Sequence, residues 1–109
     1  MDDGQTLTSP LGRIRISSAA IARIVAETAA ECYGVVAMAG RRRLRGARGI
    51  EIGADGDGVR IDLHVVVEYG LNLAEVASTV RNRVGYEVAR LTGLPVHTVE
   101  VHIDDVRTS

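Results

Sequence analysis

Residues 54–70 read ADGDGVRIDLHVVVEYG, and this stretch decides the fold. Its first five residues hold two Asp-Gly pairs, which supply the positive φ angles that a tight β-hairpin turn requires. From residue 59 to residue 67 every second residue is Val, Ile or Leu, so one face of the strand is apolar. A shorter alternating segment, residues 50–52, precedes the turn. Two strands joined as a hairpin are therefore predicted, with one face in the core.

A first amphipathic helix is predicted upstream of this hairpin. Apolar residues recur every three or four positions over residues 18–32, and the charged residues between them fall on the opposite side. Ser17 stands where an N-cap belongs, and Gly34 stands where a left-handed residue would end the helix. Short strands are expected on either side of the helix, at residues 13–16 and 35–38.

A second amphipathic helix is predicted between Asn72 and Gly93. Asn72 is a favourable N-cap, and Glu75 three positions on completes a capping box. The apolar stripe that follows consists of Leu73, Val76, Ala77, Val80, Val84, Val88 and Leu91. Gly93 and Pro95 end the helix, and alternation returns in residues 97–106 as a closing strand.

These elements follow one another in the order β-α-β-β-α-β. They predict an α+β domain of two layers, in which two helices pack on one face of a mainly antiparallel sheet. The 109 residues, 46% of them hydrophobic, suit one such domain, and its core must be aliphatic because Phe and Trp are absent. Residues 1–10 are polar and aperiodic, so we expect a flexible N-terminal lead before a single domain at residues 11–109.

The sequence also bears on the compartment. The first residues, MDDGQ, are acidic and polar, whereas a secretory signal begins basic and continues apolar. The most apolar long stretch, residues 19–39, contains Arg23, Glu27 and Glu31, which would be costly inside a bilayer. The lone Cys32 is expected to be a small buried thiol in a reducing compartment. We therefore expect a cytoplasmic protein.

Six short motifs occur along the chain in the order of a known family. They are GRIRIS at 12–17, AAECYGV at 29–35, GIEI at 49–52, IDLHVVVEYG at 61–70, EVA at 75–77 and TGLPV at 92–96. In these motifs the chain resembles the alkaline-shock family of bacterial envelope-stress proteins. The resemblance spans almost the whole sequence.

The resemblance implies a non-catalytic envelope-stress adaptor or scaffold, which acts through self-association or through a membrane-anchored protein partner. Such a protein would be cytoplasmic, or peripheral at the inner face of the cell membrane. The sequence itself holds no nucleophile elbow and no glycine-rich phosphate loop between a strand and a helix. We therefore expect no enzyme activity, no catalytic residues and no cofactor.

One charge cluster stands out in a chain whose net charge is −1. It consists of Arg41, Arg42, Arg43, Arg45 and Arg48, in a segment that is expected to be a loop. These are the candidate binding residues, for a protein partner or for an anionic membrane surface, where each contributes about 1 kcal/mol. The alternative function is a small nucleic-acid-binding domain that uses the same arginines on phosphates, although aromatic residues that stack bases are scarce. A solvated loop without a ligand also stays open.

Histidines and acidic residues alternate onto the solvent side of two predicted strands. The set is Asp62, His64, His97, Glu100, His102 and Asp104. A zinc site needs three or four ligands that converge at about 2 Å, and the sequence leaves open whether the two strands are neighbours. We therefore interpret these residues as solvent-facing polar groups and predict no metal site.

Some apolar residues extend beyond the predicted core faces. Val66 belongs to the solvent-facing set of the long strand, and Ala74, Tyr86 and Ala89 widen the second helix beyond one stripe. Two interpretations stay open, ordinary surface apolarity and an interface with a partner or with a second copy in a homo-oligomer.

Overall fold

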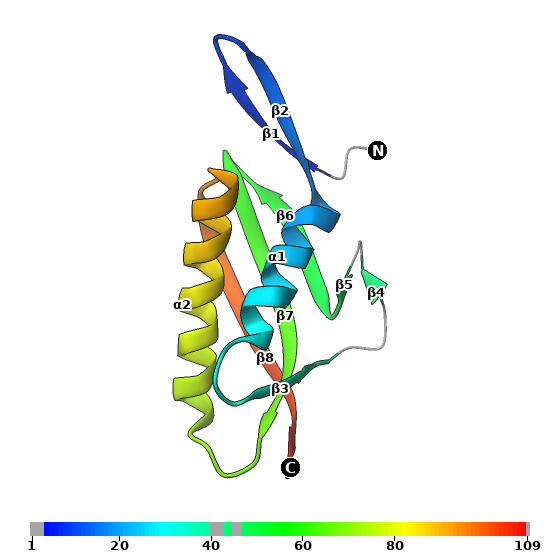
Figure 1. The fold of residues 1–109 in the computed structure, drawn as a ribbon, viewed down its shortest axis with the longest axis vertical. Helices are drawn as coiled ribbons and strands as arrows, with labels where there is room; N and C mark the ends of the chain where they lie inside the picture. The colour runs from blue at the N-terminus through cyan, green and yellow to red at the C-terminus, as the bar shows by residue number, and fades with distance from the viewer. Residues whose placement is uncertain (1–3, 40–42, 45–46, 109) are drawn as a thin grey trace.

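Two helices lie side by side on one face of a central sheet, and a hairpin near the N-terminus extends beyond it (Figure 1). The structure is a computed structural model that describes residues 4–39, 43–44 and 47–108. Helix α1 spans Ser18–Ala30 and helix α2 spans Leu73–Thr92. The predicted α+β class, with two layers and both helices on one face of the sheet, is confirmed.

Eight strands complete the described part of the chain. They are β1 (Gly4–Ser9), β2 (Gly12–Ser17), β3 (Val35–Met38), β4 (Arg43–Leu44), β5 (Ala47–Arg48), β6 (Ile50–Asp55), β7 (Gly58–Glu68) and β8 (Val96–Arg107). Strand β7 is the centre of the main sheet. It pairs antiparallel with β6 along its first half and with β3 along its second half, whereas β8 runs parallel to it along the other edge. Helix α2 is the crossover that makes this parallel pair possible.

The core lies between the helices and the apolar face of β7. The alternating residues of β7 that the sequence assigned to the core are all fully buried: Val59, Ile61, Leu63, Val65 and Val67. The helices cover them with the buried residues Ile21, Val25, Ala29, Val76, Val80, Val84 and Val88. The aliphatic core and most of both helical stripes thus follow from the periodicity of the sequence. Leu73 and Leu91 of the predicted second stripe are exceptions, because they lie near the two ends of α2 and are 42% and 53% exposed.

The helix caps agree with the sequence at three of four ends. The Ser17 hydroxyl accepts a hydrogen bond from the Ala20 N–H at 3.1 Å, and the Asn72 side chain accepts one from the Glu75 N–H at 3.0 Å. Gly93 ends α2 in the left-handed conformation, with φ 78°. Helix α1 ends at Ala30, before the predicted Gly34, because a turn occupies residues 31–34.

The N-terminal segment differs from the sequence-based expectation. Residues 4–9 form strand β1, where the sequence predicts a flexible lead without regular structure. This strand pairs antiparallel with β2, so β2 belongs to a separate two-stranded sheet and not to the central one. The period of β1 is weak because the strand contains one large apolar residue, Leu7, among Thr and Gln residues. Strands β4 and β5 likewise pair antiparallel within the predicted loop.

Candidate binding site on the open face of the sheet

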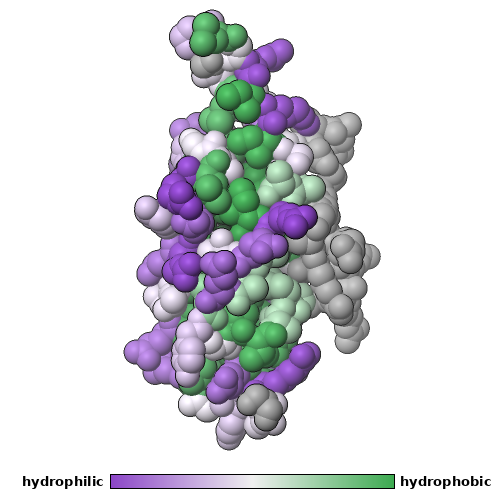
Figure 2. Space-filling view, viewed as in Figure 1, coloured by the Kyte–Doolittle hydropathy of each residue, from purple (hydrophilic) through white to green (hydrophobic). Residues whose placement is uncertain are grey.

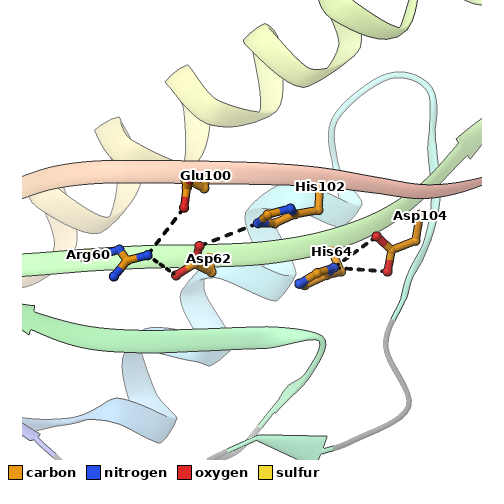
Figure 3. A network of polar contacts seen from close by, with 6 residues as sticks. All are labelled: Arg60, Asp62, His64, Glu100, His102 and Asp104. Carbon is orange, nitrogen blue, oxygen red and sulfur yellow. Dashed lines mark hydrogen bonds and ion pairs between the residues drawn. The ribbon is translucent and has the colours of Figure 1, made fainter.

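The face of the sheet opposite the helices carries a group of charged and imidazole side chains (Figure 3). They come from β7 and β8, whose parallel register places Asp62 beside Glu100 and His64 beside His102. We call the six residues the open-face cluster: Arg60, Asp62, His64, Glu100, His102 and Asp104. Their side chains meet because alternation turns them all to the same face of adjacent strands.

The two histidines of the open-face cluster form a stacked pair. Their ring centroids are 4.3 Å apart and the ring planes differ by 11°. His64 Nδ1 lies 3.0 and 3.1 Å from the two carboxylate oxygens of Asp104, which fixes its ring against the sheet. His102 Nε2 lies 3.6 Å from Asp62 Oδ1 on the neighbouring strand. Each imidazole is therefore oriented by a carboxylate of the other strand (Figure 3).

Arg60 places a positive charge between two carboxylates of the cluster. One guanidinium nitrogen, Nη2, lies 3.4 Å from Glu100 Oε1 and 3.5 Å from Asp62 Oδ2. The Asp62 side chain is only 17% exposed, whereas Arg60 is about half exposed. Asp62 therefore contacts both a cation and an imidazole while it is largely shielded from water.

Three residues of the cluster have the chemistry and spacing of metal ligands. One ligand atom each from Asp62, Glu100 and His102 lies within 4.8 Å of the other two. The spacing of two between Glu100 and His102 indicated that both lie on one face of their strand. The sequence did not show that this strand pairs with the strand of Asp62. The third histidine, His97, lies apart and pairs with Asp57 at 2.7 Å, and this hydrogen bond lowers the pKa of the Asp57 carboxyl.

The five predicted binding arginines lie partly outside the described residues. Arg41, Arg42 and Arg45 lie outside the described residues. Arg43 and Arg48 are described by their backbones, which face each other in the β4–β5 pair. The role of all five arginines in binding stays a prediction.

Cys32 is a buried thiol, as predicted. Its Sγ donates to the Thr28 carbonyl oxygen at 3.5 Å. Burial raises the pKa of the Cys32 thiol, and the nearby Arg83 guanidinium offsets part of that effect. Because the thiolate is the nucleophile, this environment favours a structural role.

Apolar side chains gather in a band on the helix-bearing side of the molecule. Figure 2 shows hydrophobic residues from the hairpin at the top down to the middle of the body. We call the hairpin part the apolar hairpin face, and it consists of Leu7, Ile14 and Ile16 on one face of the hairpin, with Leu11 in the adjoining turn. Leu11 is 100% exposed and Ile14 is 60% exposed.

Below the hairpin, a groove of about 250 Å³ lies between the two helices. Its lining is Arg23, Ile24, Glu27, Thr28, Glu31, Glu87 and Leu91. Three glutamates and one arginine surround the apolar residues, and each glutamate lies within ion-pair distance of an arginine of α1 or α2. We call this feature the α1–α2 groove.

Comparison with known proteins assigns the chain to a family. Residues 6–108 match the model of the alkaline shock protein 23 family, which is described as having a cell envelope-related function. The chain belongs to this family. The match confirms the resemblance to alkaline-shock proteins that the sequence motifs indicated. Neither helix in the described ranges combines the length and apolar character needed to cross a membrane.

Relatives of the chain include proteins of Bacillus subtilis. The uncharacterized protein YloU is 31% identical over 114 residues, which cover 94% of this chain and 95% of that protein. The uncharacterized protein YqhY is 26% identical over 102 residues, which cover 85% of this chain and 76% of that protein. These relatives support the family assignment.

Among solved structures the chain is similar to MamM CTD variants. One of them, a nickel form, matches with a TM-score of 0.55 and 14% identity over 81% of this chain and 98% of that chain. A second matches with a TM-score of 0.56 over 83% of this chain and 99% of that chain. At this identity the likeness concerns the fold alone, and it agrees with the β-α-β-β-α-β arrangement.

Proposed function

We propose that this protein is a non-catalytic adaptor of the cell envelope that assembles by self-association. Family membership supports the relation to the envelope. The observation that carries the assembly is the apolar hairpin face, which reaches beyond the body of the protein with Leu11 and Ile14 exposed. Its binding surface in a second copy is the α1–α2 groove.

The hairpin needs a cover for physical reasons. A two-stranded hairpin alone is marginally stable in water, and its stability comes from packing on other elements. Leu7 and Ile16 pack against the core, whereas Ile14, which lies opposite Leu7 in the β1–β2 register, is 60% exposed. Leu11 at the turn is fully exposed. Full burial of one Ile or Leu side chain contributes about 1.5–3 kcal/mol. Contact with a second molecule would therefore stabilise the hairpin.

Matching apolar surfaces favour a second copy as the occupant. The alternation of β1 and β2 turns Arg13 and Arg15 to the opposite face of the hairpin, so the contact face itself is apolar. The α1–α2 groove offers Ile24 and Leu91 within a rim of glutamates that arginines already pair. An apolar hairpin face thus fits an apolar groove whose rim charges are neutralised, and their contact would remove both apolar surfaces from water.

Charged substitutions on either surface are expected to prevent self-association. In sedimentation velocity, the wild type should form concentration-dependent dimers or larger species. Ile14→Asp on the hairpin and Leu91→Asp in the groove should each shift the protein to monomer, since a carboxylate would be buried at the contact. Thr8→Asp, on the opposite face of the same hairpin, is the matched control and should assemble like the wild type.

Mixing the two variants provides the decisive step. The Ile14→Asp protein keeps an intact groove and the Leu91→Asp protein keeps an intact hairpin, so an equimolar mixture should form a 1:1 complex. Monomeric wild type across the concentration range, or a mixture that stays monomeric, would rule out hairpin-to-groove assembly. Recovery from cells of a membrane-anchored protein by the wild type but not by Ile14→Asp would assign the hairpin to that partner instead.

The arginine segment can be tested in the same cells. A variant in which all five arginines at 41, 42, 43, 45 and 48 become Ala is expected to recover less of an envelope partner in a tagged pull-down, because the local positive charge is lost. Recovery that equals the wild type would mean that the segment is not a contact. Recovery of RNA that nuclease removes would support the nucleic-acid alternative, which also predicts a steep dependence on salt.

A further inference from the structure

We propose that the open-face cluster is a binding site for a divalent transition-metal cation, with zinc as the best fit. The ligands would be Asp62, Glu100 and His102. This site lies on the face of the sheet opposite the α1–α2 groove and is independent of the proposed self-association. The protein would then bind a metal ion in addition to assembling through the hairpin.

The distances suit a tetrahedral ion. Two ligands at 2.0–2.1 Å from a tetrahedral zinc lie about 3.4 Å from each other. His102 Nε2 and Asp62 Oδ1 are 3.6 Å apart, so these two atoms already have the required separation. The ligand atom of Glu100 lies within 4.8 Å of both, and its side chain is about half exposed. A change of its rotamer would complete three protein ligands, with water in the fourth position.

The orientation of His102 is determined before any ion arrives. Stacking on His64 at 4.3 Å holds the ring plane, and the bonds of His64 to Asp104 hold that stack in place. His102 therefore presents Nε2 to Asp62. His64 does not converge on the same point, because its ring is nearly parallel to that of His102 and its Nδ1 is engaged with Asp104.

The charge of the cluster favours a cation. Asp62, Glu100 and Asp104 contribute three negative charges against one positive charge from Arg60. The Arg60 guanidinium already lies between Asp62 and Glu100, which shows that these carboxylates hold a positive group at this place. A metal ion would have to displace it, and the exposed Arg60 side chain can move into solvent. Arg60 is thus expected to weaken metal binding by competing for the same carboxylates.

The donor set selects the class of metal. A neutral imidazole suits zinc, nickel and copper, whereas calcium and magnesium favour sites made of oxygen ligands alone. Two carboxylates with one imidazole on an open sheet face leave coordination positions for water. This pattern indicates an exchangeable ion and not a closed structural site.

Isothermal titration with zinc chloride on the full chain, freed of metal and without a polyhistidine tag, tests the proposal. We expect one ion per chain. His102→Ala and Asp62→Asn should each weaken binding at least tenfold, because each removes a ligand. His97→Ala is the matched control, since His97 lies on the same strand but pairs with Asp57 outside the cluster, and its affinity should equal that of the wild type.

The variant Arg60→Gln distinguishes zinc binding at the open-face cluster from nonspecific zinc binding elsewhere on the surface. If Arg60 competes with the metal, this variant should bind zinc several-fold more tightly than the wild type. Thermal melts of each metal-free variant check that it is folded, and zinc should raise the melting temperature of wild type but not of Asp62→Asn. The proposal is overturned if zinc fails to bind, if His97→Ala and His102→Ala lose affinity equally, or if Arg60→Gln binds no better.

Discussion

Leu63→Ala is expected to lower the free energy of unfolding by about 2–5 kcal/mol. Leu63 is fully buried at the middle of β7, between Ile50 of β6 and Val101 of β8. Both helices cover this face of the sheet, so the atoms removed would leave a cavity that packed elements surround. The cost includes the lost transfer free energy of the side chain and the unfilled space.

Urea denaturation followed by circular dichroism measures this loss as a lower midpoint at an unchanged slope. Leu11→Ala is the matched control, because the same atoms are removed from a side chain that is fully exposed. Its stability should remain within about 0.5 kcal/mol of the wild type at protein concentrations where the chain is monomeric. Equal losses in the two variants would contradict the placement of the core around β7.

The fold was largely predictable because its main elements carry strong local signals. The Asp-Gly turn and the strict alternation of β7 specify a hairpin strand with one core face, and Asn72 with Glu75 specifies the start of α2. Strand β1 was missed because a strand with one large apolar residue has no clear period. Its pairing with β2 depends on the tertiary structure, which the β-propensity of single residues does not determine.

Val66 shows where alternation itself fails. The sequence places Val66 on the solvent side of its strand, but the side chain is only 3% exposed. Both neighbouring strands have a register shift at this level, between Val35 and Ala37 in β3 and opposite Val65 and Val66 in β8. The extra residue of each bulge lies in β3 or β8 and not in β7, and the position of a bulge cannot be derived from a period of two. Val66 thus stays on the face of β7 opposite Val65 and Val67, and alternation alone does not predict that it is buried there.

The open-face cluster could be predicted only in part. A spacing of two residues puts Asp62 and His64 on one face of β7, and does the same for Glu100 and His102 on β8. Whether these pairs meet depends on which edge of β7 receives β8 and in which register. Both are determined by the crossover through α2 and by the packing of the whole core, and neither has a local signal in the sequence.

Gly49→Ala is expected to cost about 3 kcal/mol or more of folding stability, because strain and a backbone clash would combine. Strands β3 and β6 pair with different halves of the same edge of β7, and Gly49 lies where one ends and the other begins. His64 joins the two strands, since its N–H donates to the Gly49 carbonyl and its carbonyl accepts from the Ala39 N–H. Gly49 has φ 73°, and a Cβ there would lie 1.7 Å from the Ala39 oxygen.

Chemical denaturation of Gly49→Ala beside Gly53→Ala measures this cost. Gly53 in β6 is the control position and should be neutral or slightly stabilising, since its Cβ would meet no atom within 4 Å. If the Gly49→Ala protein were as stable as Gly53→Ala, the close approach of Gly49 to Ala39 between β6 and β3 would be contradicted. Because His64 also supports His102, Gly49→Ala should disturb the open-face cluster as well. Weaker zinc binding at a temperature where the variant is still folded would reveal that coupling.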